Sequence, residues 1–259
     1  MQYMDNLNAQ IEQAKQTLQI NDEDFIGIFL YGSQNYELDY DKSDTDSILL
    51  IQSANKPKQE LRTSTGKIKI YTLKYFIYRL KQGDLECYEI LCTKYSILNP
   101  LYKSQFTKFS QEFLNCINYE RVKYSLLIKL QEHLDCVLWM FLNPEKARYN
   151  KKRLYWAIRV CNQLQRINDG QDFKSSLVYY PSLDYDLLKI KTITNYLSIK
   201  EFNELYKYLV KYLRSLPRYS KEVLDEEEKC LSKFYTSMIK QNLNYKGGNL
   251  FWLRKIYRL

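Results

Sequence analysis

The stretch Phe29–Ile51 constrains this chain more than any other part of it. Its residues are typical of a strand, a Gly-Ser turn, a polar loop, and a second strand that begins with two aspartates. Asp44 and Asp46 are two positions apart, so on an extended strand both carboxylates point to one face. Gly32 lets the backbone approach a ligand closely, and Ser33 adds a hydroxyl donor.

Paired carboxylates repel each other, and a divalent cation between them relieves that repulsion. Oxygen ligands of this kind suit Mg²⁺, which usually takes one or two carboxylates together with substrate phosphates. The pattern therefore predicts a Mg²⁺ site at Asp44 and Asp46, with Mn²⁺ as the other metal to test, and metal-assisted transfer of a nucleotide or phosphoryl group. The alternative is a polar hairpin loop whose acids are only solvated.

Charge is spread unevenly along the 259 residues. Residues 1–100 hold 11 Lys and Arg against 14 Asp and Glu, whereas residues 101–259 hold 28 against 16. An acidic half next to a basic half favours an enzyme that handles polyanions, with a nucleoside triphosphate (NTP) and RNA as expected partners. A lysine-rich solvated surface is the alternative.

Other classes of site lack the residues they need. The six cysteines form no Cys-x-x-Cys pair and the single histidine is His133, so zinc sites and His-based triads are disfavoured. We expect buried, reduced thiols and a helix-face histidine. No apolar run reaches about 18 residues and the start lacks a secretory pattern, which predicts no membrane span and a cytoplasmic protein.

Hydrophobic periodicity gives an outline of the secondary structure. Gly83 is a candidate helix C-cap, Asp84 an N-cap, and Ser198 with Glu201 a capping box. The predicted strands are 25–31, 45–51 and 67–71, the predicted loops are 53–65 and 171–186, and the predicted helices are 4–19, 73–81, 84–91, 104–116, 119–143, 147–168, 199–214 and 220–241.

These elements predict an α+β fold. A small mixed β-sheet with flanking helices should form a catalytic domain over residues 1–100, followed by an all-helical, basic domain over residues 101–259. The basic and aromatic end of the chain, residues 246–259, either docks on the core or meets RNA, and docking is favoured.

The Gly-Ser turn followed by Asp-x-Asp between apolar strands resembles the active-site motif of the DNA polymerase β nucleotidyltransferase superfamily. Its spacer is most similar to the branch of predicted nucleotidyltransferases that are associated with RNA repair and common in phage genomes. The resemblance implies that Asp44 and Asp46 hold the metal, that Ser33 takes part in catalysis, and that Gly32, Ser33 and Ser43 bind the nucleotide.

Two further blocks resemble the same branch. Asp84 and Glu89 lie in a segment similar to a family Gly-Asn-x-x-x-x-Glu-x-Leu pattern, with Asp84 where Asn is usual. Lys152, Trp156 and Arg159 lie in a segment similar to Lys-x-x-Tyr-His-x-x-Arg, with Trp156 replacing the histidine. Because Lys152 and Arg159 share one helix face, they are expected to grip the triphosphate, while Trp156 is expected to pack in the core.

One departure concerns a third carboxylate that superfamily enzymes usually place on the next strand. Lys67 occupies its expected position, and a protonated lysine does not ligate a metal. Either Glu86 or Glu89 substitutes, or the alignment is shifted, or the protein is catalytically impaired.

The resemblance therefore implies a metal-dependent nucleotidyltransferase that moves a nucleoside monophosphate from an NTP to an acceptor hydroxyl, first of all on RNA such as a tRNA 3′ end. A catalytically impaired relative that binds nucleotide, RNA or a host protein, as a phage accessory or antagonist, is one alternative. A transferase that labels a protein hydroxyl is another.

Overall fold

The structure is a computed structural model that describes residues 2–36, 38, 44–52, 58–141, 150–178, 187–192 and 197–245. Its contacts divide the chain into two compact units. The first, called the sheet unit here, comprises Met1–Gly32, Lys42–Ile117 and Val223–Leu259. The second, the helical unit, comprises Ser33–Asp41 and Asn118–Glu222. The predicted boundary near residue 100 differs from this division.

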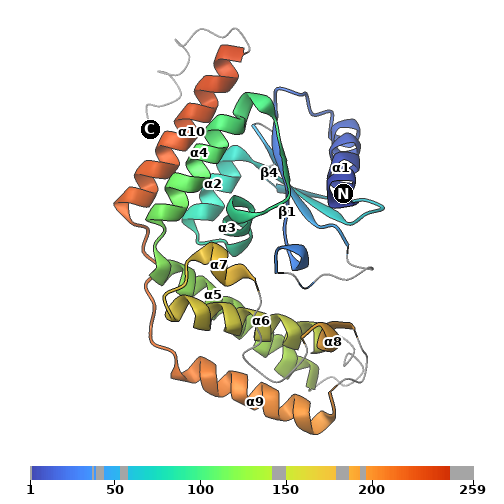
Figure 1. Ribbon diagram of the computed structural model, residues 1–259, viewed down its shortest axis with the longest axis vertical. Coiled ribbons are helices and arrows are strands. Elements are labelled where there is room, and N and C mark those ends of the chain that lie inside the picture. Colours follow the sequence, from blue (N-terminus) through green and yellow to red (C-terminus); the bar gives the residue numbers. More distant parts are fainter. Residues whose placement is uncertain are drawn as a thin grey trace. The chain divides into compact units, whose positions relative to one another are not determined.

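The sheet unit is built on a five-stranded mixed sheet of order β3-β4-β2-β1-β5 (Figure 1). Strands β2 and β4 run parallel, and the other neighbouring pairs are antiparallel. The sheet with its helices, together with the helical region, confirms the predicted α+β class. The strands are β1 (Phe25–Leu30), β2 (Ser47–Ile51), β3 (Lys58–Arg62), β4 (Lys67–Thr72) and β5 (Ser96–Leu98).

Helix α1 (Gln2–Leu18) covers one face of the sheet (Figure 1). Its apolar positions Leu7, Ile11 and Ala14 recur at helical spacing and are fully or almost fully buried. They pack in one cluster with side chains from three strands: Phe25, Ile28, Leu30, Leu49, Ile51, Ile68 and Ile70.

Aromatic side chains fill the other face, where α2 (Leu73–Lys81), α3 (Leu85–Cys92), α4 (Pro100–Cys116) and α10 (Asp225–Tyr245) lie. The rings of Phe109 on α4 and Phe234 on α10 stack with centroids 3.8 Å apart. Phe106 contacts both Phe29 of β1 and Phe234. This packing explains why α10 belongs to the sheet unit, although the helices that precede it in the sequence belong to the helical unit.

Two strands were missed by the sequence interpretation. Strand β3 lies within the predicted loop 53–65, because its residues Lys-Gln-Glu-Leu-Arg are mostly charged. Such residues are common on an edge strand, and β3 pairs with β4 alone. The three residues of β5 form the other edge and are too few to show an alternating pattern.

The helical unit contains α5 (Tyr119–Phe141), α6 (Asn150–Asn168), α7 (Phe173–Leu177), α8 (Leu187–Thr192) and α9 (Ile199–Ser215). The predicted capping box at Ser198 and Glu201 opens α9, and Asp84 caps α3 as expected. The predicted loop 171–186 is wrong over α7, which Asp172 caps. Within the described parts of the chain, no helix combines the length and apolar character needed to cross a bilayer.

The β3–β4 turn approaches the start of β2 very closely. Gly66 has φ +152°, and a Cβ built on it would lie 2.4 Å from the carbonyl oxygen of Thr45. The Thr45 N–H donates to Thr65 O at 2.8 Å, so the turn and the Asp44–Asp46 segment are joined backbone to backbone. Only glycine fits this position without displacing the segment that carries the two aspartates.

Replacing Gly66 with alanine should therefore destabilise the sheet unit. We expect Gly66→Ala to lower the free energy of unfolding by about 2–4 kcal/mol, from backbone strain and the contact with Thr45. Gly170→Ala is the matched control, because Gly170 has φ +87° but no atom within 4 Å of its built Cβ, and should lose only about 1 kcal/mol. Equal losses in urea denaturation of the two variants would contradict the close approach.

Candidate active site

Thr45 is anchored between the two candidate metal ligands. Its side chain is almost fully buried, whereas Asp44 is exposed and Asp46 is half-buried. From α1, Gln10 Nε2 donates to Thr45 O at 2.7 Å and Asn6 Nδ2 donates to Thr45 Oγ1 at 2.8 Å. These bonds, with the backbone bond to Thr65, hold the segment just before β2 in one conformation.

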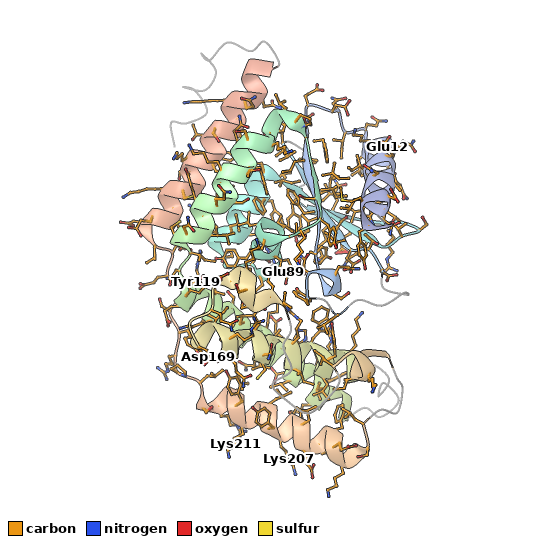
Figure 2. The ribbon with its side chains drawn as sticks, in the orientation of Figure 1. Glu12, Glu89, Tyr119, Asp169, Lys207 and Lys211 are labelled. Atoms are coloured by element: carbon orange, nitrogen blue, oxygen red, sulfur yellow. The ribbon has the colours of Figure 1, made fainter. Side chains whose placement is uncertain are left out.

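The turn after β1 brings a backbone donor to the same region of the sheet unit. Tyr31 N–H donates to Asp46 O at 3.1 Å, which carries the β1–β2 pairing one step past the strands. Gly32 follows with φ +93°, and its N–H donates to Glu89 Oε2 at 3.4 Å. Glu89, labelled in Figure 2, is 3% exposed and lies on α3, so the turn is tied to a buried carboxylate.

Burial and charge act on Asp46 in opposite directions. Burial raises the pKa of its carboxyl above the usual range, and the negative charge of Asp44 adds to that rise. The charges of Lys67 and Lys69 lower it, as does the Lys67 N–H, which donates to Asp46 Oδ1 at 3.3 Å. The net rise in pKa means that the fold disfavours the ionised form of Asp46 relative to water, chiefly because burial removes its hydration.

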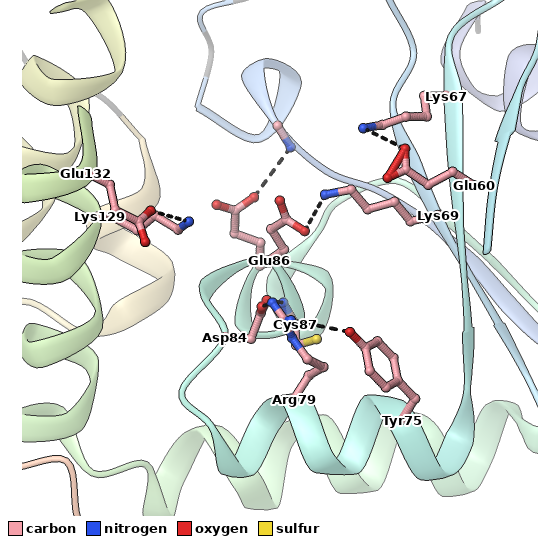
Figure 3. A network of polar contacts seen from close by, with 12 residues as sticks. Glu60, Lys67, Lys69, Tyr75, Arg79, Asp84, Glu86, Cys87, Lys129 and Glu132 are labelled. Carbon is pink, nitrogen blue, oxygen red and sulfur yellow. Dashed lines mark hydrogen bonds and ion pairs between the residues drawn. The ribbon is translucent and has the colours of Figure 1, made fainter. Parts of the chain in front are cut away.

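The lysines of β4 are engaged by acids of neighbouring elements (Figure 3). Lys67 Nζ lies 3.3 Å from Glu60 Oε2 of β3, and Lys69 Nζ lies 2.5 Å from Glu86 Oε2 of α3. The parallel register pairs Ser47 with Ile68, which places Lys67 beside Asp46, the residue just before β2. This is the position at which the family resemblance led us to expect a third carboxylate.

Tyr31 is affected by the charges of three acids of the sheet unit, Glu86, Asp46 and Glu89. The pKa of its phenol is raised by burial first and then by the charges of Glu86 and Asp46, with smaller contributions from Tyr71 and Glu89. Lys69 Nζ lies 4.8 Å from the centre of the Tyr31 ring. Neither Tyr31 nor Lys69 was singled out from the sequence, since only the folded sheet brings them to α3.

The described residues contain no group of three or more His, Cys, Asp and Glu side chains placed to hold a metal ion. A metal would therefore be held by Asp44 and Asp46, with oxygens of substrate and water as its other ligands. This donor set fits Mg²⁺, which commonly binds through one or two carboxylates and substrate phosphates. Burial disfavours the ionised form of Asp46, and a cation bound beside it would stabilise that form.

Ser33 opens the 3₁₀ helix η1 (Ser33–Tyr36), and its carbonyl accepts a bond from Leu38 N–H at 3.0 Å. Both belong to the helical unit. The roles predicted for Ser33, Lys152 and Arg159 beside the two aspartates, which lie in the sheet unit, stay predictions. Ser43 and the basic end of the chain at 246–259 lie outside the described residues.

The predicted phosphate-binding face of α6 has two different environments. Lys152 is exposed, whereas Arg159 is 6% exposed, with its Cζ 3.8 Å from the centre of the Tyr36 ring and 5.0 Å from that of Trp156. Arg159 Nη1 also donates to Gln163 Oε1 at 3.3 Å. Trp156 is half-buried and contacts Tyr36 edge to face, in line with the expected packing role.

His133 of α5 lies beside this aromatic group. Its ring stacks on Trp156 with centroids 6.4 Å apart, and Arg153 Nη1 lies 3.5 Å from His133 Nδ1. Burial lowers the His133 pKa to about 3, and the positive charges of Arg153, Arg159 and Lys129 add to that shift. The imidazole is therefore neutral at pH 7 within a cationic part of the helical unit.

Comparisons with known proteins give a likeness to a solved structure. No family model matches the sequence, and no curated protein matches it. Among solved structures, the chain is similar to a nucleotidyltransferase-like protein from Exiguobacterium sibiricum, with 13% sequence identity and a TM-score of 0.29. The match covers 96% of this chain and 81% of that one, and at this TM-score it assigns no activity.

Removing the charge of Asp46 should stabilise the protein at neutral pH. Because the folded state raises the Asp46 pKa, it binds this proton more tightly than the unfolded chain does, and stability falls as pH rises through the folded pKa. Asp46→Asn should therefore raise the melting temperature at pH 7, with the gain vanishing below about pH 4. Asp169→Asn, at an exposed site, is the control; a lower melting temperature for Asp46→Asn at pH 7 would contradict the shift.

Proposed function

We propose that the protein is a metal-dependent nucleotidyltransferase that moves a nucleoside monophosphate from an NTP to an acceptor hydroxyl on RNA, such as a tRNA end. The observation that carries the proposal is the pair of carboxylates at Asp44 and Asp46, held on either side of the anchored residue Thr45. Rigid positioning of charged groups before substrate arrives is what electrostatic catalysis requires.

The NTP phosphates would be seated by the turn after β1. The Gly32 N–H has a long bond of 3.4 Å to Glu89, so a closer phosphate oxygen is a better acceptor for it. Ser33 and Ser43 add hydroxyl donors, and Lys152 and Arg159 add positive charge from the helical unit. Mg²⁺ bound at the aspartates would neutralise charge on the phosphates.

The attacking hydroxyl must also lose a proton as it bonds to the α-phosphorus and pyrophosphate leaves. Of the two acids expected to substitute for a third carboxylate, Glu89 is buried against Gly32. The side chain of Glu86 is 36% exposed, and its charge, like that of Asp46, raises the pKa of Tyr31. We assign the role of general base to Glu86, because it is the acid that an acceptor can reach.

Transfer should be lost when both aspartates are neutralised. With α-³²P-labelled NTPs, Mg²⁺ and total RNA and protein, Asp44→Asn/Asp46→Asn should label its acceptor at least about 1,000-fold less than the unmodified protein. The matched control is Glu12→Gln/Asp169→Asn, which removes two exposed acids and should keep full activity. Undiminished labelling by the aspartate variant would refute the proposal, and sensitivity of the label to RNase or protease identifies the acceptor class.

A second candidate function is nucleotide binding without turnover. The observation that favours it is the effect of Lys67 and Lys69, whose charges already lower the pKa of Asp46. Two fixed cations at this place supply part of the positive charge that a metal brings to an active enzyme. A triphosphate could then be held by lysines alone.

Calorimetry separates these two functions through metal dependence. If the protein is a transferase, ATP should bind at least about tenfold more weakly in EDTA than in Mg²⁺, since the phosphates lose their bridging cation. If it only binds nucleotide, affinity should be similar in both buffers and fall in Lys67→Gln. Metal-independent binding together with no labelled product would reject the transferase.

A further inference from the structure

The end of α9 and the segment after it form an uninterrupted basic stretch. Residues 205–221 contain five Lys and Arg and no Asp or Glu. All five cations are exposed. We call them the basic ridge, which consists of Lys207, Lys211, Arg214, Arg218 and Lys221.

The first three cations lie along one side of α9. Spacings of four and three residues put Lys207, Lys211 and Arg214 on one face, at steps of about 6 and 4.5 Å along the axis. Figure 2 shows Lys207 and Lys211 on the outer side of the helix. Leu205 and Leu209 on the opposite side are 3% and 0% exposed, so the apolar face of α9 is already used in packing.

The three ridge cations on α9 are not paired with acids of the described residues. The ion pair found on α9 joins Lys200 to Glu204 at the other end of the helix. Within the parts of the chain that the structure describes, no carboxylate lies within ion-pair distance of Lys207, Lys211 or Arg214. A row of uncompensated cations favours an extended polyanion over a single small anion, which needs a concave site.

An exposed aromatic ring lies beside the row. Tyr208 is 42% exposed and is three residues before Lys211 on α9, so the two are neighbours on the helix surface. Cations that follow a phosphate backbone, together with an aromatic ring on which a base stacks, are typical of surfaces that bind single strands. A membrane surface fits less well, because an interfacial helix needs a free apolar face and that of α9 is buried.

We propose that the basic ridge and Tyr208 bind a single-stranded nucleic acid through its phosphates and one stacked base. The inference rests on the proposed function in one respect, since it identifies a surface of the helical unit that holds the RNA acceptor. Binding itself requires neither an NTP nor a metal, so it is measurable apart from transfer.

The test is fluorescence anisotropy of a labelled 20-nucleotide oligouridylate with the full chain, in EDTA without NTP, at several KCl concentrations. Neutralising three phosphate contacts in Lys207→Gln/Lys211→Gln/Arg214→Gln should weaken binding about 100-fold at 0.1 M salt and reduce the slope of log K against log salt by about 2. Tyr208→Ala should weaken binding roughly tenfold with an unchanged salt slope.

Matched controls make the result specific. Lys74→Gln/Lys103→Gln/Lys229→Gln removes the same charge from exposed sites of the sheet unit and should keep the affinity and the slope. Asp44→Asn/Asp46→Asn should also bind normally, which separates failure of the ridge from failure of catalysis. Thermal melting verifies that each variant is folded.

Three outcomes would overturn the proposal. They are an unchanged slope in the ridge variant, an equal loss in the control lysine variant, and binding to phosphatidylcholine–phosphatidylserine vesicles (4:1) but not to the strand. Comparison of oligouridylate with oligothymidylate shows whether the surface takes RNA alone or both kinds of strand, and either result supports it.

Discussion

The anchoring of Thr45 is the constraint on which the candidate site depends. Two side chains of α1, from Asn6 and Gln10, hold its hydroxyl and carbonyl, and the β3–β4 turn holds its N–H. Asp44 and Asp46 are thereby kept on either side of a buried residue, although they lie before the first residue of β2. Because the anchors come from α1 and from the β3–β4 turn, the position of the carboxylates is set by contacts across the sheet unit and not by a local motif.

The same region contains a carboxylate whose ionised form is disfavoured by folding. Asp46 is partly desolvated beside Asp44, while Lys67 and Lys69 oppose that cost and are themselves paired with Glu60 and Glu86. Functional sites commonly carry such imbalance, because a ligand can then supply what the protein lacks. Under the proposed function, a bound cation would relieve this cost, and Lys67 and Lys69 would determine how much positive charge a metal has to provide.

The cations of the helical unit differ in how deeply they are buried. Arg159 is enclosed by the rings of Tyr36 and Trp156, and His133 is kept neutral beside Arg153. The cations at the end of α9 are instead exposed, because its apolar face is used in packing. Residues of one chemical type thus have two environments, since the Arg159 guanidinium is in contact with aromatic rings and the cations of α9 are open to solvent.

The sequence by itself determined the α+β class, three central strands and most helices, because buried strands and amphipathic helices leave a periodic pattern. It also predicted site roles for Asp44, Asp46 and Gly32 from their local spacing, and these roles stay predictions. It did not reveal β3, which is charged because it lies at an edge, or the grouping of α10 with the sheet through Phe234. Only the tertiary structure decided that Gln10 and Gly66 fix Thr45, that Lys67 lies beside Asp46, and that Arg159 is buried while Lys207 is exposed. The physical reason is that these features depend on contacts between residues far apart in the chain, which a local pattern does not encode.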